Sequence, residues 1–151
     1  MDKTPMTIKK LSIATLSYII ITMMIAFPWH MIWFHDVYKT IGAITRPEPI
    51  ILFGLIAVSI QGLAIAYLYP FYYRGGNPIT QAIKFSLLFG AVIFSVMGFA
   101  TAAKININPV STFLIHSVIF QIIQFVLTGT ALGLIYGRIE PNSPHLKTAT
   151  P

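Results

Sequence analysis

A few ionisable side chains lie just inside or just beyond the apolar stretches of this chain, where they could do chemistry. His30 and His116 each lie a little inside one end of an apolar stretch, and His35 and Asp36 follow His30 closely. Imidazoles near carboxylates suit Zn, Cu or Fe, and two imidazoles on facing helices can ligate a haem. We therefore consider a cofactor site in which His30 and His116 bind haem, or all four residues bind a transition metal. Histidine also titrates near neutral pH, which would suit proton relay or substrate binding.

The same residues also allow a structural interpretation. Histidine at a membrane interface can bond to headgroups or to the backbone, and the i, i+5 spacing of His30 and His35 does not align two ligands on one helical face. Asp36 and Glu48 would then only neutralise nearby Lys39 and Arg46. The interfacial interpretation and the cofactor interpretation both stay open at this point.

Nucleophilic and phosphate-binding chemistry have no visible site. The chain has no cysteine, which excludes thiolate metal sites and cysteine nucleophiles. Ser117 follows His116 directly, but no acid is placed to orient that histidine. Gly75 and Gly76 form a turn sequence without the lysine and hydroxyl residue of a phosphate loop. We predict no catalytic residues, and a protein that is not an enzyme is the favoured interpretation.

Three glutamines interrupt the apolar stretches. Gln61 lies at mid-stretch, at a depth between those of Gln121 and Gln124 when the residues are counted along helices. An unpaired amide in hydrocarbon costs several kcal/mol, so we expect these three residues, the polar seam, to hydrogen-bond across helices. They would either hold the helices together or line the path of a polar solute.

Three glycines recur every fourth residue near the C-terminus. Gly129, Gly133 and Gly137 fall on one face of a helix. Glycines at this spacing let another backbone approach closely within a membrane. We expect this face to pack against a second helix, either within the chain or in an oligomer.

The elements that must position these residues are four apolar stretches. They cover residues 11–34, 50–69, 85–103 and 111–136, and each has the length of about 20 residues that a bilayer requires. Charged residues make up only 9% of the chain, against about 25% in soluble domains. The sequence predicts an all-α membrane protein, a four-transmembrane-helix bundle over residues 11–138 whose first partner is the lipid bilayer. Residues 1–10 would form a cytoplasmic tail and residues 139–151 a mobile one.

The charge of +6 sets the orientation of the helices. The basic residues stand singly or in small groups between the stretches, so they form no patch for nucleic acid. One side of the predicted bundle carries more of them: Lys3, Lys9, Lys10, Arg74, Lys84, Arg138 and Lys147, against Lys39, Arg46 and Lys104 on the other. Because cytoplasmic loops carry the excess of lysine and arginine, both termini are predicted to be cytoplasmic in a multi-pass protein of the inner (plasma) membrane.

Several short strings resemble a family of small, uncharacterised bacterial inner-membrane proteins with four transmembrane helices. These strings are Pro28-Trp29-His30, His35-Asp36-Val37-Tyr38, Arg46-Pro47-Glu48-Pro49, Gln61-Gly62, Tyr69-Pro70 and Gly133-Leu134-Ile135-Tyr136-Gly137. The resemblance covers about residues 10–138. It implies a bacterial membrane location and no known reaction, so it assigns no catalytic residue.

Three functions follow from these patterns. The first is a non-enzymatic accessory or scaffold subunit, or a small oligomer, within a larger membrane complex of unknown partner. The second is a redox protein that holds a metal or haem on His30 and His116. The third is a small transporter or channel with Gln61, Gln121 and Gln124 along its path.

Overall fold

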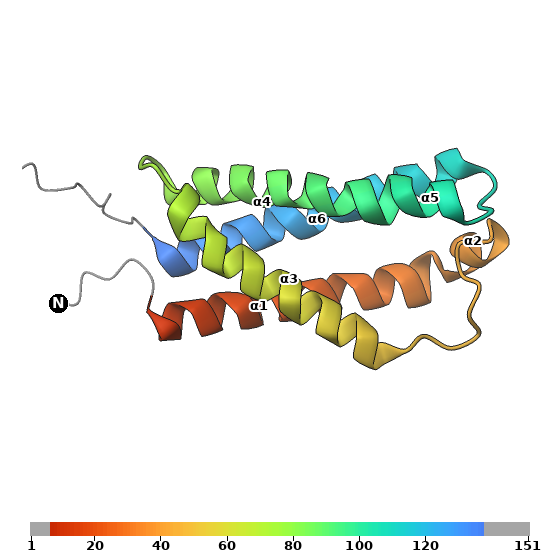
Figure 1. Cartoon of the computed structure of the whole chain (residues 1–151), viewed down its shortest axis with the longest axis horizontal. Coiled ribbons are helices and arrows are strands. Elements are labelled where there is room, and N and C mark those ends of the chain that lie inside the picture. Colours follow the sequence, from red (N-terminus) through yellow and green to blue (C-terminus); the bar gives the residue numbers. More distant parts are fainter. Residues whose placement is uncertain (1–6, 138–151) are drawn as a thin grey trace, which may run out of the picture.

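A computed structural model of the chain describes residues 7–137. Within that range every regular element is a helix, and four continuous helical rods are long and apolar enough to cross a membrane: 8–33, 51–72, 78–104 and 110–136. The all-α four-helix bundle is thereby confirmed (Figure 1). The elements are α1 (Ile8–Pro28), the π-helix η1 (Trp29–Trp33), α2 (His35–Thr40), α3 (Ile51–Tyr72), α4 (Pro78–Phe94), the π-helix η2 (Ser95–Ala100), α5 (Thr101–Lys104) and α6 (Val110–Tyr136).

Capping residues set the start of two rods. The side chain of Thr7 accepts a hydrogen bond from the Lys10 amide at 3.2 Å, so α1 begins inside the predicted tail. The side chain of Asn77 accepts one from the Thr80 amide at 3.1 Å. Pro78 follows at the first helical position, where no N–H is needed. The third rod therefore begins at Pro78 and not at residue 85, because caps mark a helix start more closely than hydropathy does. The predicted mobile tail at 139–151 lies outside the described residues.

Neither proline within the rods ends its rod. Pro28 is the last residue of α1, and the rod continues beyond it as η1, after which the short helix α2 follows. α3 runs on past Pro70 to Tyr72. A neighbouring helix can satisfy the carbonyl that a proline frees within a membrane.

The four rods form two closely packed pairs. α4 lies along α6, and α1 lies against both α3 and α6, whereas α3 touches α4 and α6 only slightly. The start of α1 and the end of α6 meet at one end of the bundle, where the Lys10 ammonium donates to the Tyr136 carbonyl at 3.2 Å. We call this end the termini side, and the opposite end, which carries α2 and α5, the loop side (Figure 1).

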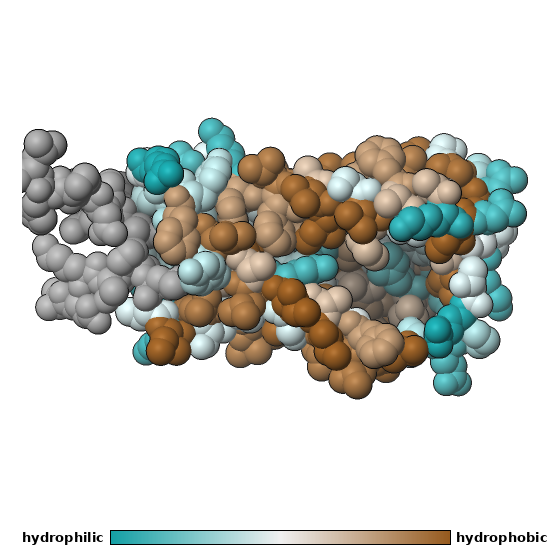
Figure 2. Space-filling model, in the orientation of Figure 1, coloured by the Kyte–Doolittle hydropathy of each residue, from teal (hydrophilic) through white to brown (hydrophobic). Residues whose placement is uncertain are grey.

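Two buried clusters hold the bundle. The cluster toward the termini side contains Tyr18, Ile65, Tyr69, Phe125, Leu132 and Tyr136, each almost fully buried. Two of its tyrosines bond to backbone: the Tyr136 hydroxyl donates to the Ala66 carbonyl at 2.7 Å, and the Tyr69 hydroxyl to the Pro78 carbonyl at 3.0 Å. The loop-side cluster contains Trp29, Tyr38, Ile41, Ile107 and Phe113. The face shown in Figure 2 is largely hydrophobic between the two ends, as a bilayer requires.

Candidate functional site

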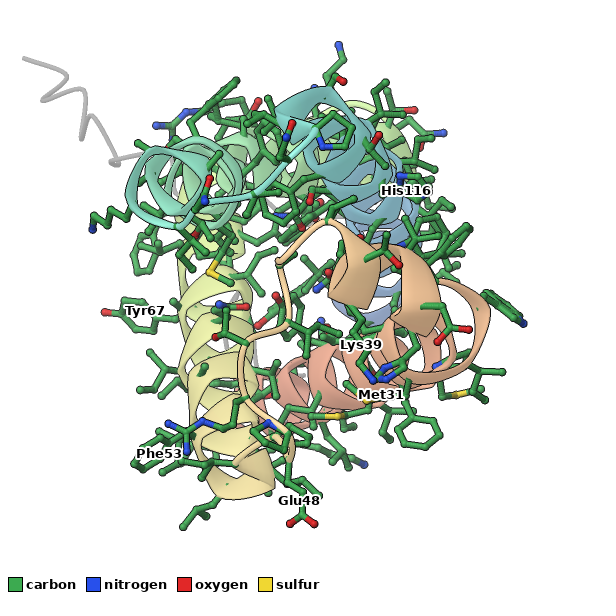
Figure 3. All side chains as sticks on the ribbon, turned by 90° about the vertical axis from the view of Figure 1, so that its right-hand side faces the viewer. Met31, Lys39, Glu48, Phe53, Tyr67 and His116 are labelled. Carbon is green, nitrogen blue, oxygen red and sulfur yellow. The ribbon has the colours of Figure 1, made fainter. Side chains whose placement is uncertain are left out.

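The four residues nominated for a metal site are not gathered around one point. His30 lies on η1, His35 and Asp36 on α2, and His116 on α6. No three histidine or acidic side chains within residues 7–137 are close enough together to hold a metal ion. Asp36 is exposed, and Glu48 and His116 lie on different sides of the loop-side end (Figure 3). The four residues therefore do not form a metal-binding group in this structure, and the metal site stays a prediction.

Aromatic rings occupy the space beside the imidazoles of His30 and His116. The Tyr38 ring centroid lies 5.0 Å from that of His30 and 6.1 Å from that of His116. His30 also contacts Phe120, and His116 contacts Phe34. A haem held between the two histidines would have to displace the Tyr38 ring that both of them contact. The pair consequently does not fit axial haem ligation.

Tyr38 is the centre of this loop-side aromatic cluster. Trp29 donates its indole N–H to the Tyr38 hydroxyl at 3.2 Å, and both side chains are buried. Burial raises the pKa of Tyr38 above its ordinary value, while hydrogen bonds with Trp29 and Ser117 act in the opposite direction. The hydroxyl is therefore neutral at neutral pH, and its bond to Trp29 fits a role in packing α2 onto the bundle.

A hydrogen-bonded network joins three helices at the middle of the membrane. The Tyr18 hydroxyl on α1 donates to the Gln61 side-chain oxygen on α3 at 2.8 Å. The Gln124 amide on α6 donates to the hydroxyls of Tyr18 at 3.1 Å and Thr22 at 2.9 Å. Two members of the predicted polar seam thus take part, but they bond through Tyr18 and not to each other. Sequence reasoning missed Tyr18 and Thr22, although a phenol at mid-stretch is itself a signal.

Gln121, the third member of the polar seam, is not part of this network. It is half-buried and lines a pocket between α4 and α6, with only apolar neighbours around it. The side chain has no hydrogen-bond partner among residues 7–137. The expectation that all three amides bond across helices was wrong for this residue, because its side of α6 faces the apolar side chains of α4.

Two of the three glycines on α6 lie against the backbone of α4. A Cβ on Gly129 would lie 2.5 Å from the Ile83 Cα atom, and one on Gly133 would lie 2.5 Å from the Ile79 Cα atom. Gly137 differs: its φ of 60° ends the helix, and a Cβ there would meet nothing within 4 Å. The packing expected of Gly137 was wrong, because the helix stops before the α4 backbone can approach it.

The loop-side half of α3 is separated from the rest of the bundle. Residues 51–57 are exposed on every face of the helix, whereas Gly62, Ile65, Ala66 and Tyr69 farther along are buried. The surface is hollowed beside this half of α3 (Figure 2), which also stands apart when the bundle is viewed from the loop side (Figure 3). We call this hollow the α3 cleft. It begins on the loop side of the Tyr18–Gln61 bond, beyond which α3 is no longer closely packed.

Comparison with known proteins gives no relative. No protein-family model matches the chain, and neither the curated proteins nor the solved structures contain a match. The fold therefore defines the class: this is a multi-pass integral membrane protein built from four apolar helices. The α3 cleft and the midplane network are the two features from which a function can be argued.

Proposed function

We propose that the protein is a non-enzymatic accessory subunit of a membrane complex and that the α3 cleft holds a transmembrane helix of its partner. The observation that carries this proposal is the exposure of residues 51–57 on every face. A transmembrane helix in a bundle normally buries one face against its neighbours, since close packing drives helix association in lipid. In the loop-side half of α3, no face is covered by another helix among the described residues.

The glycines of the chain support the same place for a partner. Gly62, Gly90, Gly98, Gly129 and Gly133 all lie within helices, and a Cβ on any of them would meet a neighbouring atom at 3.1 Å or less. Gly54 is also within a helix, yet a Cβ there would meet nothing within 4 Å. Glycine in a helix interior costs about 1 kcal/mol relative to alanine. The close approach of a partner backbone would explain why glycine is present at position 54 in spite of this cost.

The partner should be an apolar helix. The exposed side chains around Gly54 are aliphatic or aromatic, among them Ile51, Leu52 and Phe53. Charged residues are absent from α3 itself. Both π-helices, η1 and η2, also lie in the loop-side half of the bundle. Since π-helical turns within α-helices occur frequently at functional sites, this distribution favours the loop side as the functional end.

Site-specific photocrosslinking tests this proposal. A photoreactive residue at position 54 should give a crosslinked adduct in the membrane with one integral membrane protein, which should also co-purify in mild detergent. Gly54→Trp should abolish this co-purification by filling the place of the partner helix. Met24→Trp is the matched control, because Met24 is 71% exposed and belongs to α1, not to α3. Equal adducts from positions 54 and 24, or co-purification that survives Gly54→Trp, would contradict the proposal.

We further propose that the membrane is a bacterial inner membrane and that the termini side faces the cytoplasm. Among the described residues Lys9, Lys10, Arg74 and Lys84 lie toward the termini side, whereas Lys39, Arg46 and Lys104 lie on the loop side. With no native cysteine, single-cysteine variants carry no background. A membrane-impermeant maleimide added to intact cells should label Thr45→Cys and leave Arg74→Cys unlabelled. The reverse pattern would invert the orientation.

The two other functions have less support. Gln61 and Gln124 bond to Tyr18 and Thr22, and Gln124 is only 3% exposed, which gives these amides a structural role. A polar path through the network would have to break these bonds. The histidines of the loop-side cluster lie against aromatic rings, as described above, which disfavours the redox alternative. Neither function has an observation that favours it over the accessory role.

A further inference from the structure

α4 and α6 enclose a groove that opens at the lipid-facing surface. Its volume is about 160 Å³. Gly90 and Phe125 are buried at its floor, while Leu87 and Ile122 at its rim are 38% and 51% exposed. Ala91, Phe94, Val118 and Gln121 complete its lining. The groove is apolar apart from the amide of Gln121.

This groove is separate from the α3 cleft. On α4, Phe85 contacts Tyr69 and Tyr72 of α3. Leu87 lies about 160° around the helix axis from Phe85, at 100° per residue. The groove therefore faces a different side of the bundle, and both surfaces can be occupied at once.

The Gln121 amide lacks a hydrogen-bond partner among the described residues of the chain, and the surrounding lipid cannot supply one. It lies near the middle of α6, at a depth where lipid offers only hydrocarbon. An amide left unpaired there costs several kcal/mol. The partner that completes this group must therefore bring its own hydrogen-bonding atom to the centre of the bilayer.

We propose that the partner is a second copy of this chain and that the two Gln121 side chains hydrogen-bond across a two-fold axis perpendicular to the membrane. A carboxamide carries both donors and an acceptor, so it complements itself. Two copies inserted in the same direction place Gln121 at the same depth without any adjustment of register. The contact is isologous, as in most homodimers. Ala91 is exposed and lacks a bulky side chain, which lets the second copy approach the groove.

The self-association of the purified chain tests this inference. Energy transfer between donor-labelled and acceptor-labelled copies in phosphatidylcholine vesicles should report a dimer whose population rises with the protein-to-lipid ratio. Gln121→Leu should weaken dimerisation about tenfold, the effect of a membrane hydrogen bond of about 1–2 kcal/mol. Ala91→Trp should abolish the dimer by filling the groove, whereas Met24→Trp, on the lipid-facing surface of α1, should leave it unchanged.

A chain that stays monomeric at all protein-to-lipid ratios would overturn the inference, and so would a dimer that both groove variants leave intact. Leucine at position 121 removes an unpaired amide, so the monomer should keep its fold, which circular dichroism checks. If Gln121→Leu fails to fold, the contrast between Ala91→Trp and Met24→Trp decides the question. The measurement uses the purified chain alone, so its outcome is independent of the partner proposed for the α3 cleft.

Discussion

Replacing Gly129 and Gly133 together by alanine should lower the free energy of unfolding by about 3 kcal/mol, because overpacking a close helix contact costs about 1–3 kcal/mol per site. Each new Cβ would lie 2.5 Å from a Cα atom of α4. These neighbours are backbone atoms and not flexible side-chain ends, so relief requires α4 and α6 to move apart. The loss should appear as a lower midpoint in an SDS titration followed by circular dichroism.

Gly54→Ala is the matched control for this double variant. The substitution is chemically the same and also lies within a helix, but a Cβ at position 54 meets nothing within 4 Å. The isolated chain should therefore keep its stability or gain up to about 1 kcal/mol from the better helix propensity of alanine. An equal loss in Gly54→Ala and in the double variant would show that the α4–α6 contact is not the cause.

Tyr18→Phe should cost about 2 kcal/mol, the second largest effect we expect, because one hydroxyl links three helices. Its removal takes away the donor to Gln61 and one acceptor of the Gln124 amide. The Gln61 oxygen would then lack this donor in the middle of the membrane, while Gln124 would keep its bond to Thr22. The same SDS titration measures the change.

Two further variants test whether the loss of stability comes from the hydrogen-bonded network or from the removal of any tyrosine hydroxyl. Tyr67→Phe removes a hydroxyl from a side chain that is 46% exposed on α3, and it should change the stability little. Gln61→Leu combined with Tyr18→Phe should cost less than the sum of the two single changes, because both remove the same bond. Strict additivity of the two would mean that the bond contributes nothing to stability.

The fold follows from the sequence because hydropathy and length alone decide which segments cross the membrane. The four rods appear where the apolar stretches predicted them, and the main error, the start of the third, arose from a cap that hydropathy does not register. Residues 78–84 carry Thr80, Gln81 and Lys84, which lower the hydropathy without breaking the helix. Asn77 with Pro78 was the local signal for the true boundary.

The candidate sites were less predictable, because they depend on how helices rotate and separate. Glutamines at matching depth were visible in the sequence, but their link through Tyr18 depends on which faces of α1, α3 and α6 meet. The π-helices also change which faces of the first and third rods meet their neighbours: η1 follows Pro28 directly, but no such residue precedes η2, which follows Phe94. The separation of α3 was also invisible, since residues 51–57 are as apolar as the packed half of the same helix.

The weak contact of α3 with α4 bears on how the chain enters the membrane. Sequence neighbours pair strongly on either side of it: α1 with α3, and α4 with α6. The molecule is thus two helical hairpins connected by the short turn at residues 73–77 and closed along α1 and α6. Each hairpin can form its own contacts while it leaves the insertion machinery. The midplane bonds from Gln124 to Tyr18 and Thr22 would then form last, when the two separately inserted hairpins pack against each other.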